Sequence, residues 1–343
     1  MRRALVTGGA GFIGSHLSEL LLADGWEVFV LDDLSTGSPG NVAALRDRPD
    51  YHLVVESVLS RAVVSELVHK CDIVYHLAAA VGVRLIVEQP GRTLLTNVQG
   101  TETVLEYCAR FGKRVLVASS SEVYGDHREE CALDEDARRI YGPTTSKRWA
   151  YADTKAMDEF LALALHAERG LDCVIARLFN TVGPRQSGQY GNVIPRFVAA
   201  ALAGRPLEVH GDGTQTRCFC HVSDTVRALA GLTAEPATAG RIYNVGSTDR
   251  ITIGELARRV LELTGSSSEL VFVPYDEDGS SSELVSVPYD EVYGQGIDEM
   301  FHRAPAIDRI SEAIGWRPTR SLERIIADVI EHTRGRAGTP VEA

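Results

Sequence analysis

The sequence predicts an α/β protein with a Rossmann-like, doubly wound parallel sheet and a smaller C-terminal region. Two observations carry this prediction. Apolar strand-like segments alternate with helical segments over roughly the first 175 residues, as is typical of a parallel sheet with helices on both faces. From about residue 180 the alternation gives way to short segments broken by glycines and prolines, so we expect a smaller region lying over one edge of the sheet.

The first strand, residues 3–7, is followed at once by the glycine-rich stretch Gly8–Gly14. Helical periodicity then runs to Asp24, and a second strand over residues 28–31 ends at Asp32-Asp33. A dinucleotide site requires this order, because glycines let the backbone approach a pyrophosphate and the helix N-terminus supplies N–H donors. Asp32 can accept from ribose hydroxyls and repels a 2′-phosphate, so the sequence predicts NAD rather than NADP. The alternative is a glycine-rich turn without a ligand.

Further strands are expected over residues 51–55, 73–77, 114–118 and 173–180, with helices ending near His69 and covering about 92–111. Ligands on parallel sheets bind at the carboxyl ends of the strands. That edge should gather the glycine turn, the acidic pair, Leu77–Ala79, Ser119–Glu122 and Asn180. The predicted cofactor contacts are Gly8, Gly11, Phe12, Ile13, Gly14, Asp32, Asp33, Leu77, Ala78, Ala79, Tyr151 and Lys155.

Tyr151 and Lys155 stand four residues apart in Tyr-Ala-Asp-Thr-Lys, just ahead of an alanine- and leucine-rich helix. Residues at this spacing share one helix face. An ammonium beside a phenol favours the phenolate and lowers the tyrosine pKa, so Tyr151 could take a proton from a sugar hydroxyl near neutral pH. By itself the spacing is common, and a solvated helix pair is the alternative.

The composition of the chain argues against several classes of function. The 343-residue chain has a formal net charge of −12, which argues against a general nucleic-acid binder. Its six cysteines are scattered, and His76, His210 and His221 lack metal-ligand spacing, so we expect reduced thiols and no metal. We find no run typical of a signal peptide or a membrane span. The sequence therefore predicts a cytoplasmic protein without a membrane or nucleic-acid partner.

Residues 265–278 recur as residues 279–292 with 12 of 14 positions identical. Two copies are too few for a solenoid, which needs at least three repeats. We expect a local duplication whose extra copy forms a hairpin or a loose excursion, with a turn at Asp278-Gly279. The sequence does not indicate which copy takes the ancestral place.

These features resemble the extended short-chain dehydrogenase/reductase family, in its NAD-dependent nucleotide-sugar group. The matching motifs begin at Thr7 (TGGAGFIG), His76 (HLAA), Ser119 (SSSEVYG), Tyr151 (YADTK), Arg177 (RLFNTVGPR) and Asn244 (NVGS). The resemblance implies that Tyr151 and Lys155 are the catalytic pair and that Ser120 hydrogen-bonds the sugar O4. It implies an NAD-binding domain over 1–178, rejoined near 215–247, a mainly nucleotide-sugar-binding region over 179–335, and a tail over 336–343.

The family's enzymes share a 4-ketosugar intermediate and differ in its fate. A 4,6-dehydratase carries an aspartate where this chain has Ser121, which counts against dehydration. Ser121-Glu122 and Arg303, in a motif resembling Arg-x-Pro-x-Ile, are most similar to UDP-glucuronic acid decarboxylases. In them Ser121 and Glu122 would assist carboxylate loss and reprotonation, and Arg303 would hold a ligand charge. A structural Glu122, bonded to backbone N–H groups at the strand end, is the alternative.

Other features keep alternatives open. The loop Ala80–Arg84 is closer to epimerases, so a UDP-sugar 4-epimerase is the second hypothesis, and a non-catalytic NAD- or nucleotide-sugar-binding regulator is the third. Arg217 resembles a diphosphate contact, and Asn180 and Arg185 resemble substrate contacts. An ion pair at the surface and a self-capping asparagine are the competing interpretations of Arg217 and Asn180. The long helices near 92–111 and after Tyr151 have broad apolar faces, which in this family pair into a homodimer.

Overall fold

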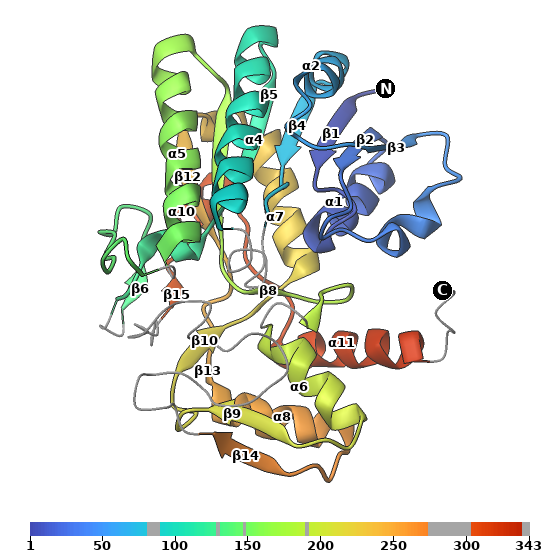
Figure 1. Cartoon of the computed structure of the whole chain (residues 1–343), viewed down its shortest axis with the longest axis vertical. Helices are drawn as coiled ribbons and strands as arrows, with labels where there is room; N and C mark the ends of the chain where they lie inside the picture. Colours follow the sequence, from blue (N-terminus) through green and yellow to red (C-terminus); the bar gives the residue numbers. More distant parts are fainter. Residues whose placement is uncertain (81–89, 128–130, 147–148, 189–191, 274–302, 338–343) are drawn as a thin grey trace.

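The computed structural model describes residues 1–80, 90–127, 131–146, 149–188, 192–273 and 303–337. Its centre is a seven-stranded sheet in the order β12-β7-β5-β4-β1-β2-β3 (Figure 1). Every neighbouring pair in it is parallel, which confirms the predicted fold class. The strands are β1 Arg3–Thr7, β2 Glu27–Asp32, β3 Tyr51–Val55, β4 Ile73–His76, β5 Arg114–Ser120, β7 Cys173–Leu178 and β12 Arg241–Val245.

Helices cover both faces of this sheet, because successive strand side chains point to opposite sides. In β1, Ala4 and Val6 pack into one core cluster and Leu5 into the other. The first cluster includes residues of α1 Phe12–Ala23, α7 Val222–Ala234 and α10 Asp308–Ile314. The second includes residues of α2 Arg61–Lys70, α4 Pro90–Phe111 and α5 Ala150–Arg169.

A smaller region lies beyond the carboxyl ends of the strands (Figure 1). It has its own apolar core, formed mainly by α6 Val193–Leu202, α8 Ile253–Thr264 and α11 Leu322–Ala337. Four short two-stranded pairs complete the described part of the chain. They are β9 Leu207–His210 with β14 Leu270–Val273, β10 Thr216–Cys218 with β13 Arg250–Thr252, β8 Thr181–Val182 with β11 Cys220–His221, and β6 Ala132–Leu133 with β15 Ala304–Pro305. The 3-10 helices are η1 Pro39–Leu45, η2 Ser121–Tyr124 and η5 Pro236–Thr238.

The structure places part of the duplicated segment. Leu270–Val273, from the first copy, forms β14 and pairs in parallel with β9. The proposed turn at Asp278-Gly279 and the whole second copy lie outside the described residues, as does the loop from Val81 to Arg84. Among the described residues, no helix is both long and apolar enough to cross a membrane.

Candidate active site

The glycine turn joins β1 to α1 in a tightly folded arrangement. Gly8 has a φ of +71°, in the left-handed region that favours glycine. A Cβ atom on Gly14 would lie 2.2 Å from the Gly8 carbonyl oxygen, closer than any two such atoms can come. Only glycines can therefore hold the turn in this shape, with the N-terminus of α1 opening beside the carboxyl ends of the strands.

Asp32, the last residue of β2, is tied to this turn. Its Oδ2 accepts from the Ala10 N–H at 2.9 Å and its Oδ1 accepts from the Leu34 N–H at 2.8 Å. Burial raises the pKa of Asp32, and the two N–H donors oppose the rise. Asp33 is exposed, and its carboxylate accepts from the Ser35 N–H and hydroxyl. Asp32 is thus the acidic residue that the fold fixes against the glycine turn.

The segment after β4 lies against the same turn. The Leu77 N–H donates to the Thr7 carbonyl oxygen at 3.2 Å, and the Ala78 N–H donates to Thr7 Oγ1 at 3.2 Å. A Cβ on Gly8 would come within 2.9 Å of the Ala78 Cα. The glycine turn, Asp32 and Leu77–Ala79 therefore form one continuous cradle, and their donors and carboxylate fit a dinucleotide.

Tyr151 and Lys155 lie in the first turns of α5. Burial raises the pKa of Tyr151, Lys155 lowers it, and the charges of Glu122 and Asp158 raise it further. The expectation that Lys155 gives the phenol a lowered pKa is therefore wrong for the protein alone, since burial outweighs the ammonium. Lys155 is itself buried, and its Nζ lies 3.1 Å from Asp158 Oδ2.

Ser119–Glu122 continue from the end of β5 into η2. Ser120 caps η2, and its Oγ accepts from the Glu122 N–H at 3.2 Å, while Ser121 is buried. The strand end is held by Ser119, whose hydroxyl donates to Glu159 Oε1 at 2.5 Å. Glu159 in turn receives two N–H bonds from Arg177, at 2.9 and 2.7 Å. This buried network fixes where Ser120 and Glu122 stand.

Arg303 reaches this strand end from far along the sequence. It forms an ion pair with Glu122 and donates to Asn180 Oδ1 at 3.2 Å. Asn180 donates in turn to the carbonyl oxygen of Cys218 at 3.0 Å, so its side chain is not devoted to capping its own backbone. Glu122 also acts electrostatically on Tyr151. The structure therefore brings Glu122, Asn180 and Arg303 together beside the tyrosine.

The other two predicted substrate contacts are Arg185 and Arg217. Arg185 has a φ of +70° and donates to Glu19 Oε1 at 2.5 Å, on α1. Arg217, on β10, donates to the carbonyl oxygen of Thr216 at 2.8 Å. The ion pair with Glu19 joins Arg185 to α1 rather than to the Glu122 cluster. Arg148, three residues before Tyr151 and a further sequence feature that resembles the decarboxylases, lies outside the described residues.

The sequence reasoning missed Asp158, which contacts Lys155 directly. Its position three residues after Lys155 on a predicted helix is the signal that could have found it. Asp158 bonds to Thr101, and Thr101 bonds to His76. These two residues lie on separate elements, α4 and β4. No sequence spacing connects them to Lys155.

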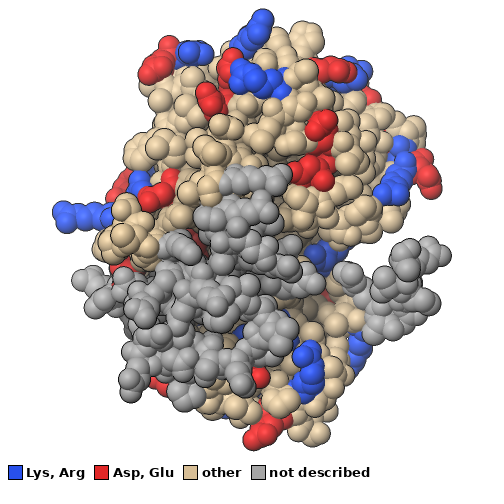
Figure 2. Space-filling view, in the orientation of Figure 1, with Lys and Arg blue, Asp and Glu red and all other residues tan. Residues whose placement is uncertain are grey.

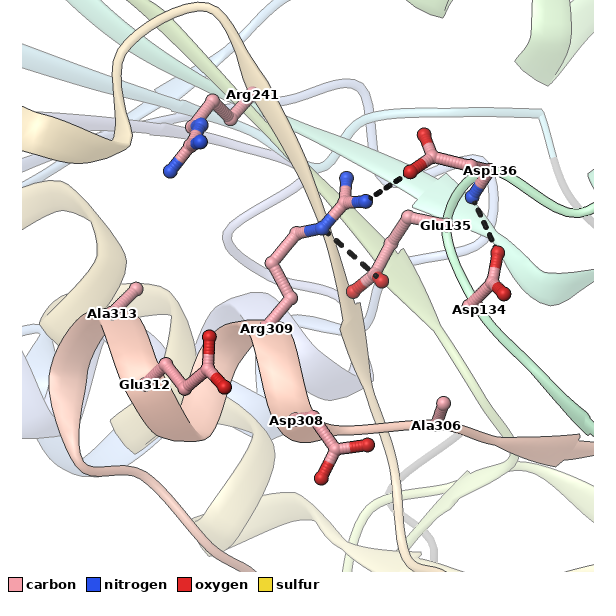
Figure 3. Close-up of a pocket in the computed structure, with 9 residues that line it drawn as sticks. All are labelled: Asp134, Glu135, Asp136, Arg241, Ala306, Asp308, Arg309, Glu312 and Ala313. Atoms are coloured by element: carbon pink, nitrogen blue, oxygen red, sulfur yellow. Dashed lines mark hydrogen bonds and ion pairs between the residues drawn. The ribbon is translucent and has the colours of Figure 1, made fainter.

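A separate hollow of about 520 Å³ lies between β12, α10 and the segment after β6 (Figure 3). Arg309 crosses it, 3.4 Å from Glu135 and 2.6 Å from Asp136. None of the predicted site residues lines it. Over the residues that the structure describes, no group of histidine, cysteine and acidic side chains is arranged to hold a metal ion.

The model of the NAD dependent epimerase/dehydratase family matches residues 4–246. The chain belongs to this family. Membership confirms the resemblance seen in the motifs, and it agrees with the dinucleotide cradle and with NAD as the cofactor.

Two curated relatives in this family are decarboxylases by name. UDP-N-acetyl-alpha-D-glucosaminuronate decarboxylase of Bacillus cytotoxicus is 38% identical, over 97% of this chain and 98% of that relative. UDP-glucuronic acid decarboxylase 1 of Arabidopsis thaliana is 33% identical, over 97% of this chain and 70% of that relative.

Solved structures of the family superpose over nearly the whole chain. The UDP-glucuronic acid 4-epimerase from Bacillus cereus, in complex with UDP-glucuronic acid and NAD, has a TM-score of 0.82 at 28% identity, covering 97% of this chain and 99% of that one. The dTDP-glucose 4,6-dehydratase from Streptomyces venezuelae, with NAD bound, has a TM-score of 0.83 at 29% identity, covering 98% of each chain. Because an epimerase and a dehydratase fit equally well, the fold does not select the reaction.

Proposed function

We propose that this protein is an NAD-dependent decarboxylase of a UDP-hexuronate, most simply UDP-glucuronate, with UDP-4-keto-pentose or UDP-xylose as product. The observation that carries the proposal is the Glu122–Arg303 ion pair beside Tyr151. A decarboxylase must hold a sugar carboxylate and then return a proton to the carbon it leaves. A guanidinium and a carboxyl group on one side of the catalytic pair can supply both functions.

The proposed reaction begins at the sugar C4. Tyr151 accepts the proton of the C4 hydroxyl, with Lys155 stabilising the phenolate, and Ser120 hydrogen-bonds the same sugar oxygen. The glycine cradle would hold NAD, which would supply the acceptor for the C4 hydride and a means of returning it. The resulting β-keto acid loses CO₂ from C5, because the C4 ketone takes up the electron pair as an enolate.

Reprotonation completes the conversion. Glu122, a carboxylate in its ion pair with Arg303, must first take up the one proton that the reaction consumes from solvent. Assisted by Ser121, it then delivers this proton to C5, while Arg303 holds the departing carboxylate's charge. With hydride return the balance is one UDP-glucuronate and one proton giving UDP-xylose and CO₂. Without it the products are UDP-4-keto-pentose, CO₂ and reduced NAD. Asn180, Arg185 and Arg217 are proposed to hold the nucleotide sugar.

The relatives support decarboxylation over epimerisation. The two decarboxylases are 33–38% identical across 97% of the chain, whereas the structurally similar epimerase is 28% identical. A 4-epimerase would need the same Tyr151, Lys155 and Ser120, together with room for the ketosugar to rotate. The intact Ser120, Tyr151 and Lys155 argue against a non-catalytic regulator.

The direct test incubates the protein with NAD and either UDP-glucuronate or UDP-N-acetylglucosaminuronate. We expect CO₂ release and a UDP-pentose product from UDP-glucuronate. If only UDP-N-acetylglucosaminuronate releases CO₂, the proposed substrate becomes that sugar, which is the one named for the 38% identical relative. Interconversion of UDP-glucose and UDP-galactose without CO₂ would refute decarboxylation, and UDP-galacturonate as the only product would indicate a uronate epimerase.

We also propose that the protein is a homodimer assembled through α4 and α5. These neighbouring helices (Figure 1) expose the large apolar side chains Leu95, Met157 and Phe160, with exposed fractions of 59%, 52% and 61%. An apolar face of this kind is typical of a helix-mediated interface. Phe160→Glu should convert a dimer to monomer in light scattering, and an unchanged mass would contradict this interface.

On the face shown in Figure 2, the described lysine and arginine side chains are interspersed with aspartates and glutamates. With a net charge of −12, such a surface does not favour nucleic acid as a partner. We propose a cytoplasmic enzyme whose partners are NAD, a UDP-sugar and a second copy of itself.

A further inference from the structure

A chain of buried hydrogen bonds leads from Lys155 to the glycine turn. Lys155 Nζ lies 3.1 Å from Asp158 Oδ2, and the two side chains are 5% and 1% exposed. Asp158 also bonds to the Thr101 side chain on α4. Thr101 Oγ1 lies 3.0 Å from His76 Nε2 on β4, and His76 Nδ1 lies 2.8 Å from Thr7 Oγ1 on β1. Four elements of the fold thus contribute to one continuous connection.

The direction of each hydrogen bond follows from its end at Asp158, because an ionised carboxylate can only accept. Thr101 therefore donates to Asp158 and accepts from His76 Nε2. His76 Nδ1 is then the acceptor for the Thr7 hydroxyl, whose oxygen also accepts from the Ala78 N–H. Burial, which lowers the pKa of His76 to about 3, keeps the ring neutral. Thr101 donates onward to Asp158, so the Asp158 carboxylate is the final acceptor for both Thr101 and Lys155.

An ammonium as buried as that of Lys155 needs a counter-charge, since burial disfavours its charged form. The titratable groups that face it are Tyr151, Asp158 and Glu159 on α5 and His76 on β4, with Glu122 on η2 acting on the tyrosine. Burial lowers the pKa of Lys155, but Asp158 above all raises it, and the net shift is upward. Asp158 is the carboxylate that hydrogen-bonds to the ammonium.

We propose that Asp158 is a positioning residue that holds Lys155 charged and in place beside Tyr151, and that the chain through Thr101 and His76 to Thr7 fixes Asp158. The proposal rests on the proposed function in assigning the proton transfer to Tyr151 and Lys155. It adds a residue that touches neither substrate nor cofactor and acts through Lys155. The catalytic pair is thereby connected mechanically to the glycine turn.

The first experiment measures thermal unfolding of Asp158→Asn between pH 7 and pH 10, with Asp153→Asn as control. Asp153 lies on the same helix, but it is exposed and pairs with Arg139. In the wild type the raised pKa of Lys155 contributes stability that is lost only as pH rises through that pKa. In Asp158→Asn burial loses its largest opponent, and only the weaker effects of Tyr151 and Glu159 still raise the pKa of Lys155. The pKa of Lys155 therefore falls, and the variant's deficit in Tm should be largest at pH 7 and narrow toward pH 10. The control should show no such narrowing.

The second experiment follows the pH dependence of nicotinamide reduction by UDP-glucuronate. Activity requires a charged Lys155, so the alkaline limb of the profile should move to lower pH in Asp158→Asn, by about one unit or more. Asp158→Glu retains a carboxylate and should return the limb toward that of the wild type. A uniform loss of rate with the limb unmoved would overturn the proposal.

The two experiments separate this proposal from the proposed function. If the wild type oxidises no UDP-sugar, the function fails, and the unfolding experiment still decides the role of Asp158. If the Tm of Asp158→Asn is lower than that of the wild type by the same amount at every pH, the positioning role of Asp158 is refuted. If Asp158→Asn does not fold at pH 7, refolding at pH 10, where Lys155 can lose its charge, supports the proposal, and failure at both pH values overturns it.

Discussion

Replacing Glu122 with glutamine should affect the two stages of the reaction in opposite directions. The side chain keeps its shape but loses the charge that pairs with Arg303, in a site where the two side chains are 18% and 10% exposed. General acid–base catalysis is worth about 10²–10⁴-fold. Because Arg303 remains to hold the sugar carboxylate, we expect an effect at the lower end of this range. CO₂ release should be about 10²-fold slower, which corresponds to about 2.7 kcal/mol of activation free energy.

The first hydride transfer should respond differently. The charge of Glu122 is one of the causes that raise the pKa of Tyr151, so its removal lowers that pKa and increases the phenolate fraction near neutral pH. Nicotinamide reduction in Glu122→Gln should therefore be as fast as in the wild type or faster. The acidic limb of its pH–rate profile should be shifted to lower pH.

Stopped-flow absorbance of the nicotinamide and release of labelled CO₂ measure the two stages in one preparation. Glu106→Gln is a suitable control, because Glu106 on α4 pairs with Arg61 and its side chain is only partly buried. An equal decrease in the rates of nicotinamide reduction and CO₂ release would refute the idea that Glu122 acts differently in the two stages, as would unchanged kinetics. Glu122 would then have a purely structural role.

Three further outcomes are expected. Tyr151→Phe should retain NAD and UDP-sugar binding by calorimetry while sugar oxidation falls by orders of magnitude; turnover near that of the wild type would contradict the assigned base. Gly14→Ala should weaken NAD binding at least about tenfold, since the added Cβ would lie 2.2 Å from the Gly8 carbonyl oxygen; the same change at Gly335, with nothing within 4 Å, should leave binding unaltered. Deletion of residues 279–292 should leave Tm and activity nearly unchanged, because Leu270–Val273 already pairs with β9; a large loss of Tm would show that the second copy is needed.

The sheet and the cofactor cradle could be predicted because their signals are local. Each strand is a short apolar run, and the glycines and Asp32 mark one turn and one strand end. The observed strands β1 to β5 agree with the expected ranges within a few residues. Such patterns follow from backbone geometry and need no knowledge of distant contacts.

The electrostatics of the site could not be predicted in this way. The spacing of Tyr151 and Lys155 predicts that Lys155 lowers the pKa of the tyrosine. The burial that outweighs this effect depends on packing across the whole domain. Arg303 meets Glu122 across 181 positions of sequence, and only the family motif indicated that Arg303 mattered. The reach of Arg185 to Glu19 on α1 has no signal in the sequence at all.

The position of β12 has a consequence for synthesis of the chain. β12 covers the outer edge of β7, yet more than sixty residues separate the two strands in sequence, and they include α7 as well as α6 of the smaller region. While the ribosome is still making this segment, β7 is an open edge strand whose unpaired N–H and C=O groups can bind another chain. Translation that stalls between residues 179 and 240 therefore leaves a nascent domain prone to aggregation. Arg241–Val245 is the segment that ends this exposure.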